Sequence, residues 1–195
     1  MPEEAQNTEQ RILLTAINCI NELGINKVTV RMIAERADVN VAAVNYYFRS
    51  KDRLMEQAME LAVTNLFEDV DEMLATVKDG RILVMKLLGF LLWGIEEYPG
   101  ITRSFLYAPV AGEENRGPML PAMQSLTTRL RDRLVELCPN RRQEDLEAGI
   151  MAVFSTMLIG CVVPQLYESY TAAGFGDENA RERLIAELTN MVVGG

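Results

Sequence analysis

Apolar residues recur at helical spacing along most of the chain and almost nowhere alternate strictly with polar ones. In the first stripe, Ile12, Ala16, Ile20 and Leu23 fall on one helical face, and Gly24 ends the pattern as a C-terminal cap. The sequence shows no repeats, low-complexity tracts or convincing strands. The pattern therefore predicts an all-α protein.

Capping and turn residues divide the predicted helices. Thr29, Asn40 and Ser50 are each suited to cap the helix that follows them. We expect Pro99-Gly100 to stop a helix, and a loop to run over residues 108–117. The predicted helices cover residues 8–23, 30–37, 41–48, 51–76, 81–98, 118–137, 143–170 and 177–193, with a short one through Phe105 and Tyr107.

The second and third helices are short, and a brief turn joins them, which predicts a helix-turn-helix with the first helix as its apolar floor. Val44 and Phe48 lie four positions apart on the third helix and are expected to face that floor. The residues left on its other faces are Val41, Ala42, Asn45 and Tyr46.

The charge of the chain is unevenly placed. The whole sequence has 19 basic and 28 acidic residues, a net charge of −9, which argues against a general coat for nucleic acid or membranes. Residues 25–53 nevertheless contain six basic and three acidic residues, whereas residues 54–195 contain twelve and twenty-one. A mildly basic N-terminal segment thus precedes a strongly acidic remainder.

The third helix suits the major groove of DNA, because small alanines allow close approach and Asn45 can pair with an adenine edge. Tyrosine hydroxyls and the Lys51 ammonium group can reach phosphates. Alternatively, Tyr46 and Tyr47 are partly buried packing residues, and the basic groups Arg49, Lys51 and Arg53 are solvated residues at the start of a helix. The candidate DNA-binding residues are Thr29, Arg31, Asn40, Val41, Ala42, Ala43, Asn45, Tyr46, Tyr47 and Lys51.

Three segments, QRILLTAINCINELG, TVRMIAERADV and VNVAAVNYYFRSKDRL, resemble the N-terminal domain of the TetR family of transcriptional regulators. By this resemblance Tyr46 lies at the position of a phosphate-contacting tyrosine, and Lys51 matches the lysine that starts the fourth helix. Asn40 stands where a capping serine is frequent. The sequence departs from the family at four positions: Val41 replaces a frequent lysine, Ala43 a threonine, Asn45 an aromatic residue and Tyr47 a histidine. These departures leave the fold assignment intact but affect which operator sequence the protein would recognise.

The resemblance also implies a domain organisation and partners. A DNA-binding domain over residues 1–54 would precede an effector-binding and dimerisation domain over residues 55–195. The protein would be a homodimer formed by its last two long helices, a ligand-responsive repressor that binds double-stranded DNA at a palindromic operator and is released by an apolar or amphipathic small molecule. The small residues of the 143–170 helix also fit an internal core helix.

Aromatic, methionine and basic residues of the C-terminal part are candidates for the effector pocket, although residues at such spacing are more often core. They are Phe90, Trp93, Arg103, Phe105, Tyr107, Met123, Met151 and Phe154.

Other classes of protein find less support. The chain has no histidine, no phosphate-binding glycine loop and no nucleophile motif, so we expect neither an enzyme nor a cofactor. The cysteines, at positions 19, 138 and 161, are too far apart for a metal knuckle, so we expect buried thiols and no metal. No apolar run has the roughly 20 residues that span a bilayer, and we expect a cytoplasmic protein. The remaining alternative is a helical interaction module with an idle helix-turn-helix.

Overall fold

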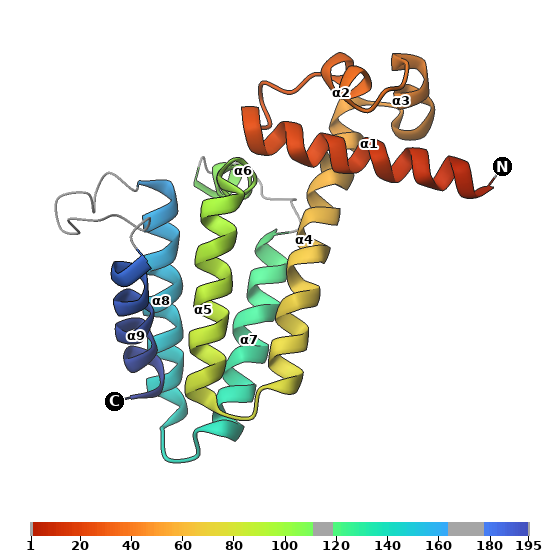
Figure 1. Cartoon of the computed structure of the whole chain (residues 1–195). Coiled ribbons are helices and arrows are strands. Elements are labelled where there is room, and N and C mark those ends of the chain that lie inside the picture. The colour runs from red at the N-terminus through yellow and green to blue at the C-terminus, as the bar shows by residue number, and fades with distance from the viewer. Residues whose placement is uncertain (1, 111–118, 164–177, 195) are drawn as a thin grey trace. The chain divides into compact units, whose positions relative to one another are not determined.

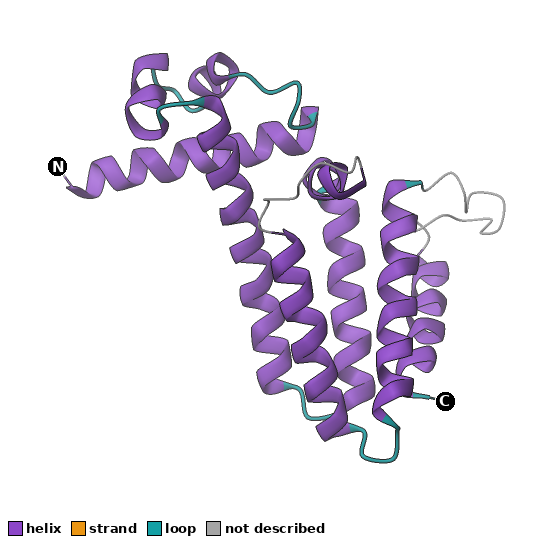
Figure 2. Ribbon diagram, turned by 180° about the vertical axis from the view of Figure 1, so that it is seen from behind, coloured by secondary structure: helices purple, strands orange, loops and turns teal. Residues whose placement is uncertain are grey.

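A computed structural model describes residues 2–110, 119–163 and 178–194, without the side chains of residues 2–6, 106–110, 119, 161 and 162. The described residues form helices and connecting turns and include no strand, as Figures 1 and 2 show, so the all-α prediction is confirmed. The helices are α1 (Pro2–Leu23), α2 (Val30–Arg36), α3 (Val41–Phe48), α4 (Lys51–Thr76), α5 (Gly80–Glu97), α6 (Pro99–Val110), α7 (Met119–Leu137), α8 (Gln143–Val162) and α9 (Glu178–Val193).

The helices form two compact units. The N-terminal unit comprises residues 1–67 and 98–120, and therefore contains α1, α2, α3, the first part of α4, and α6. The C-terminal unit comprises residues 68–97 and 121–195, with the remainder of α4, α5, most of α7, α8 and α9. The backbone passes from one unit to the other within α4, between α5 and α6, and near the start of α7.

Local side-chain caps set the helix boundaries of the N-terminal unit. The Thr29 hydroxyl accepts from the Met32 N–H at 3.3 Å, and the Ser50 hydroxyl accepts from the Arg53 N–H at 3.2 Å. Helix α1 ends where the Gly24 N–H donates to the Ile20 carbonyl at 2.8 Å. These bonds satisfy backbone groups that have no partner within their own helices. The predicted bounds of α3 and α4 are confirmed.

The core of the N-terminal unit lies between α1, α2 and α3 and extends to the first turns of α4 and to α6. Its buried apolar side chains include Ile12, Ala16, Ile20, Ile33, Val44, Phe48, Leu54, Ala58 and Ile101. The predicted burial of Val44 and Phe48 is confirmed, since each is 1% exposed. The contribution of Ile101 from α6 was not predicted.

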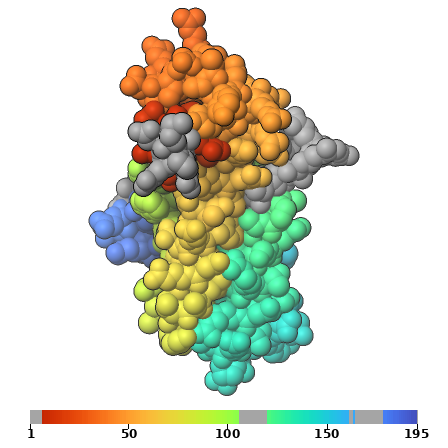
Figure 3. Space-filling model, turned by 90° about the vertical axis from the view of Figure 1, so that its right-hand side faces the viewer, coloured from red at the N-terminus to blue at the C-terminus, as the bar shows by residue number. Residues whose placement is uncertain are grey.

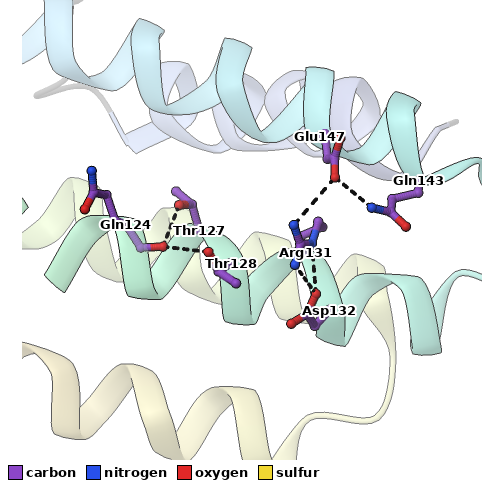
Figure 4. Close-up of polar contacts among 7 residues, drawn as sticks. All are labelled: Gln124, Thr127, Thr128, Arg131, Asp132, Gln143 and Glu147. Carbon is purple, nitrogen blue, oxygen red and sulfur yellow. Dashed lines mark hydrogen bonds and ion pairs between the residues drawn. The ribbon is translucent and has the colours of Figure 1, made fainter. Parts of the chain in front are cut away.

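In the C-terminal unit, polar contacts connect neighbouring helices. Figure 3 shows α4 and α7 side by side, and Arg129 of α7 forms an ion pair with Asp71 of α4. Figure 4 shows α7 next to α8, where Arg131 lies 3.7 Å from the Glu147 carboxylate, which also accepts from the Gln143 amide at 2.8 Å. The more exposed of these pairs stabilise the fold only slightly.

Helix α9 packs against both α5 and α8. Arg81 at the start of α5 donates to the Asn190 side chain at 2.7 Å. On α8, a Cβ atom at Gly149 would stand 2.7 Å from the Met191 carbonyl oxygen, so the two backbones approach as closely as glycine permits. Part of the small-residue pattern noted on α8 thus serves packing within the chain.

The prediction that a helix stops at Pro99-Gly100 is confirmed, since α5 ends at Glu97. The same two residues also begin α6, because proline is favoured in the first position of a helix. The predicted end of α8 was wrong. Helix α8 ends at Val162, before the predicted residue 170, since Val163 precedes a proline and leaves the helical conformation at φ −134° and ψ 64°. Helix α6 runs to Val110 into the predicted loop, whose remainder lies outside the described residues. In the described ranges, no helix is long and apolar enough to cross a membrane.

Candidate nucleic-acid interface

Helix α3 has one buried side and one exposed side. Val44 and Phe48 anchor it in the core, whereas Tyr46 is 81% exposed and Val41 is 41% exposed. Ala42 and Asn45 are also exposed, and Ala43 is half-buried at the boundary between the two sides. The four residues predicted to lie on the other faces of the helix are all exposed, which leaves two apolar residues, a carboxamide and a phenol on the surface.

The starts of α2 and α3 are held by their capping residues. Asn40 accepts a hydrogen bond from the Ala43 N–H at 2.7 Å through its side-chain oxygen. Thr29 fills the same role for α2, where it and Arg31 are both exposed. Because its side-chain oxygen is bonded to α3 itself, Asn40 stabilises the helix whatever it contacts outside the protein.

The aromatic run at the end of α3 is a linked set of rings. The ring centroids of Tyr46 and Tyr47 lie 5.3 Å apart at an interplanar angle of 83°, and those of Tyr47 and Phe48 lie 6.3 Å apart. Tyr47 is half-buried and packs against the core, so the packing alternative holds for Tyr47. It does not hold for Tyr46, whose ring stands in solvent.

Basic residues surround the junction of α3 and α4. Lys51, the first residue of α4, is half-buried, while Arg49 and Arg53 are exposed. Arg49 ends α3 at φ 64°, and its N–H donates to the Asn45 carbonyl at 2.9 Å. Arg49 and Arg53 were counted in the basic segment but were not predicted as site residues; their clustering with Lys51 was the available signal.

Arg36, another residue of the basic segment, is engaged within the protein. Its guanidinium group lies 2.6 Å from the Glu22 carboxylate and 3.6 Å from the Cys19 sulfur. Burial raises the pKa of the Cys19 thiol, although the positive charge of Arg36 acts in the opposite direction. Arg36 thus ties α2 to α1.

The predicted effector residues are distributed over both units. Phe90 and Trp93 belong to the C-terminal unit, with ring centroids 5.9 Å apart. Phe105 belongs to the N-terminal unit, where it packs against the core. Arg103 in α6 is exposed and donates to the Pro99 carbonyl at 3.1 Å.

The remaining effector candidates differ in exposure. Met123 and Phe154 are half-buried in the C-terminal unit. Met151 of α8 is 68% exposed and therefore lies on the surface of the chain. Tyr107 is part of α6, but its side chain lies outside the described part of the structure.

The family model described as bacterial regulatory proteins, tetR family, matches residues 12–58, the segment that contains the core-facing stripe of α1 and the whole helix-turn-helix. Residues 12–58 are thus a DNA-binding domain of the TetR family of transcriptional regulators. The resemblance seen in the sequence is thereby confirmed.

Two relatives described as HTH-type transcriptional regulators match about a third of this chain. The probable HTH-type transcriptional regulator YttP of Bacillus subtilis is 37% identical over 70 residues, covering 36% of this chain and 32% of the relative. The HTH-type transcriptional regulator BetI of Yersinia pestis is 32% identical over 74 residues, covering 37% of each chain. These matches therefore span only about a third of the relatives' lengths.

Other similarities extend further along the chain. The nucleoid occlusion factor SlmA of Alteromonas mediterranea is 25% identical over 171 residues, covering 87% of this chain and 86% of the relative. A TetR transcription regulator from Haloarcula marismortui has a TM-score of 0.73 at 13% identity, covering 95% of this chain and 97% of that one. A tetR-family regulator from Streptomyces coelicolor has a TM-score of 0.68 at 14% identity, with coverages of 95% and 78%. The structural likenesses show a shared fold.

Replacing Asn40 by alanine is expected to lower the free energy of unfolding of the N-terminal unit by about 1 kcal/mol, because the Ala43 N–H loses its acceptor. Asn40→Ser keeps a capping oxygen and is expected to stay within about 0.5 kcal/mol of the wild type. Urea unfolding followed by circular dichroism measures both variants. Equal stability of the alanine and serine variants would show that the cap contributes nothing.

Proposed function

We propose that the protein is a ligand-responsive transcriptional repressor that binds a palindromic DNA operator as a homodimer. The observation that carries the proposal is the exposed side of α3, which is anchored in the core by two buried residues on its opposite side. The exposed residues are Val41, Ala42, Asn45 and Tyr46. A rigid helix with small and hydrogen-bonding groups on its outer side fits the major groove.

Each group on and beside α3 has a proposed role. Asn45 pairs with an adenine edge, Val41 and the alanine methyl groups meet thymine methyl groups, and Ala43 allows close approach. Tyr46 and Lys51 bind phosphates on one side of the groove, and Tyr47 contributes its hydroxyl there. Thr29 and Arg31 at the start of α2 bind the backbone on the other side, and Asn40 presents the start of α3 to the DNA.

A homodimer through α8 and α9 is supported by apolar side chains that these helices leave in solvent. On α8, Met151, Leu158 and Ile159 are 68%, 41% and 40% exposed and follow one another at helical spacing with Ala148 and Ser155, which are exposed as well. Met191 of α9 is 53% exposed. A second copy of the chain would cover this apolar face, since a two-fold interface uses the same surface on both subunits.

The proposed effector is an apolar or amphipathic small molecule that binds the C-terminal part of the chain. Phe90 and Trp93, with their neighbouring rings on α5, are the best supported contacts among the predicted ones. Binding would weaken DNA binding by favouring one tilt of α4, the helix that is continuous between the two units.

A second candidate function is nucleoid occlusion, because the match to SlmA extends over 87% of this chain while the YttP and BetI matches cover 36% and 37% of it. Deleting the gene distinguishes the two candidates. Loss of a repressor raises transcripts next to its operators, whereas loss of an occlusion factor misplaces division relative to the nucleoid.

Selection from a pool of random DNA duplexes is expected to enrich a two-fold symmetric sequence. Asn45→Ala should lose about 1 to 3 kcal/mol of discrimination at one base pair in each half-site. Lys51→Ala should instead weaken binding to every sequence and reduce the slope of log K against log salt by about 1 per subunit.

Glu60→Ala provides the control for the selection, since this exposed residue lies on α4 away from α3 and its removal should preserve the enriched sequence. A folded wild-type protein that enriches no sequence at any salt concentration would refute the proposed operator. Equal enrichment by wild type and a Tyr46→Ala/Lys51→Ala double variant would refute the proposed contacts.

Met151→Arg is expected to convert the dimer to a monomer, because the substitution places a charge in the middle of the exposed apolar face of α8. Ile82→Arg is the matched control: Ile82 is 50% exposed on α5, outside the proposed interface, and this variant should remain dimeric. Sedimentation equilibrium measures both masses. A monomeric wild type, or a dimeric Met151→Arg variant, would contradict the proposed interface.

An effector is expected to shift the fluorescence of Trp93, the single tryptophan of the chain, to shorter wavelength by covering its half-exposed ring. Compounds found in this way are then titrated into the protein bound to its selected duplex. Typical couplings predict at least about a fivefold increase in the DNA dissociation constant at saturation. Compounds that bind near Trp93 but raise the DNA dissociation constant by less than this factor would contradict effector-controlled release.

A further inference from the structure

The start of α6 meets the end of α1 in an unusually close contact. The Gly100 N–H donates to the Asn21 side-chain oxygen at 3.1 Å. A Cβ atom at Gly100 would stand 2.6 Å from the Ile20 carbonyl oxygen and closer still to that of Asn21. Only a glycine fits against these backbone atoms without displacing one helix.

The hydrogen bond satisfies a helix terminus across a long sequence distance. Pro99 and Gly100 are the first two residues of α6, and the N–H of the second residue has no acceptor within the helix. A capping residue directly before a helix usually supplies that acceptor, but here Tyr98 stands before Pro99. Asn21, 79 positions earlier in the chain, caps α6 instead.

Beyond this contact, α6 contributes to the core on which the helix-turn-helix is built. Ile101 is 6% exposed and belongs to the same buried cluster as Ile20, Val44 and Phe48. Phe105, one turn later, packs against that cluster. The helix-turn-helix therefore rests on α1, and α1 in turn rests on α6.

We propose that Asn21 and Gly100 are positioning residues for DNA binding: they dock α6 on the end of α1 and thereby hold α1, with α2 and α3, in the arrangement that fits DNA. The proposal rests on DNA binding by α3 and adds a determinant of affinity that lies outside the DNA-contacting residues. We call this contact between Gly100 of α6 and the end of α1 the dock. Loosening the dock increases the number of arrangements of α1 relative to α6, and DNA binding must then select one of them.

The test compares two substitutions at Asn21 in the full-length chain, with the duplex enriched by the wild type as probe. Asn21→Ala removes the acceptor of the Gly100 N–H and is expected to weaken DNA binding about fivefold. Asn21→Asp keeps an acceptor oxygen of equal capping strength and is expected to restore the wild-type affinity. Ile33→Val, which removes a buried methyl group of α2 from the same core and leaves the Asn21–Gly100 hydrogen bond in place, should bind as the wild type does.

Two glycine substitutions form a second matched pair. Gly100→Ala inserts a methyl group between the backbones of α1 and α6 and is expected to weaken DNA binding by at least about tenfold. Gly94→Ala in α5 adds the same methyl group where nothing lies within 4 Å, and should leave binding unchanged. If Gly100→Ala fails to fold, the Asn21 variants decide the question.

Hydrogen exchange without DNA reports on the dock itself. The amides of residues 100–105 should exchange faster in Asn21→Ala than in the wild type, in Asn21→Asp or in Ile33→Val. Faster exchange combined with weaker DNA binding supports the proposal. Unchanged exchange, or faster exchange with wild-type affinity, overturns it, and failure of the wild type to bind any duplex refutes the proposed function separately.

Discussion

Burial of Val44 and Phe48 in the core of the N-terminal unit is the constraint on which the DNA-binding surface depends. Burying one such side chain contributes about 1.5 to 3 kcal/mol, and both stand on the same side of a helix of eight residues. Rotating α3 by one residue, about 100°, would expose them and drive Asn45 or Tyr46 toward the core. The exposed side chains are therefore determined by the buried ones, and α3 needs no DNA to present them.

The sequence was most informative where the physical cause lies within a few residues. Thr29, Asn40 and Ser50 cap the helices that follow them, so the starts of α2, α3 and α4 were predictable from local capping preference. The error at the end of α8 was of the same local kind, because the proline after Val163 is visible in the sequence but was not weighed.

Contacts between distant positions carry no such signal. Asn21 lies within α1, and nothing near it in the sequence indicates that it caps α6. The effector candidates show the same limit: residue type selected Phe105 and Met151 equally, yet Phe105 packs against a core and Met151 is exposed to solvent. Helical spacing shows which residues share a side, but the partner of that side depends on the fold. The exposed side of α3 was predictable because the core that buries its other side is built largely from the helices next to it in the chain.

The path of the backbone gives the dock on α1 a role in communication that α4 alone would not have. Because residues 98–120 belong to the N-terminal unit while α5 and most of α7 belong to the other, the chain leaves the C-terminal unit at the end of α5, passes through α6, and returns in α7. A shift at the end of α5 therefore acts directly on Pro99, which begins α6, and on Gly100, whose N–H is bonded to Asn21 of α1. Helix α4 and the junction of α5 with α6 are thus two of the three places at which the backbone connects the C-terminal unit to the unit that contains the helix-turn-helix. An effector that favours one arrangement of the C-terminal unit would bias α3 through both, with the coupling set by how rigidly Asn21 holds α6.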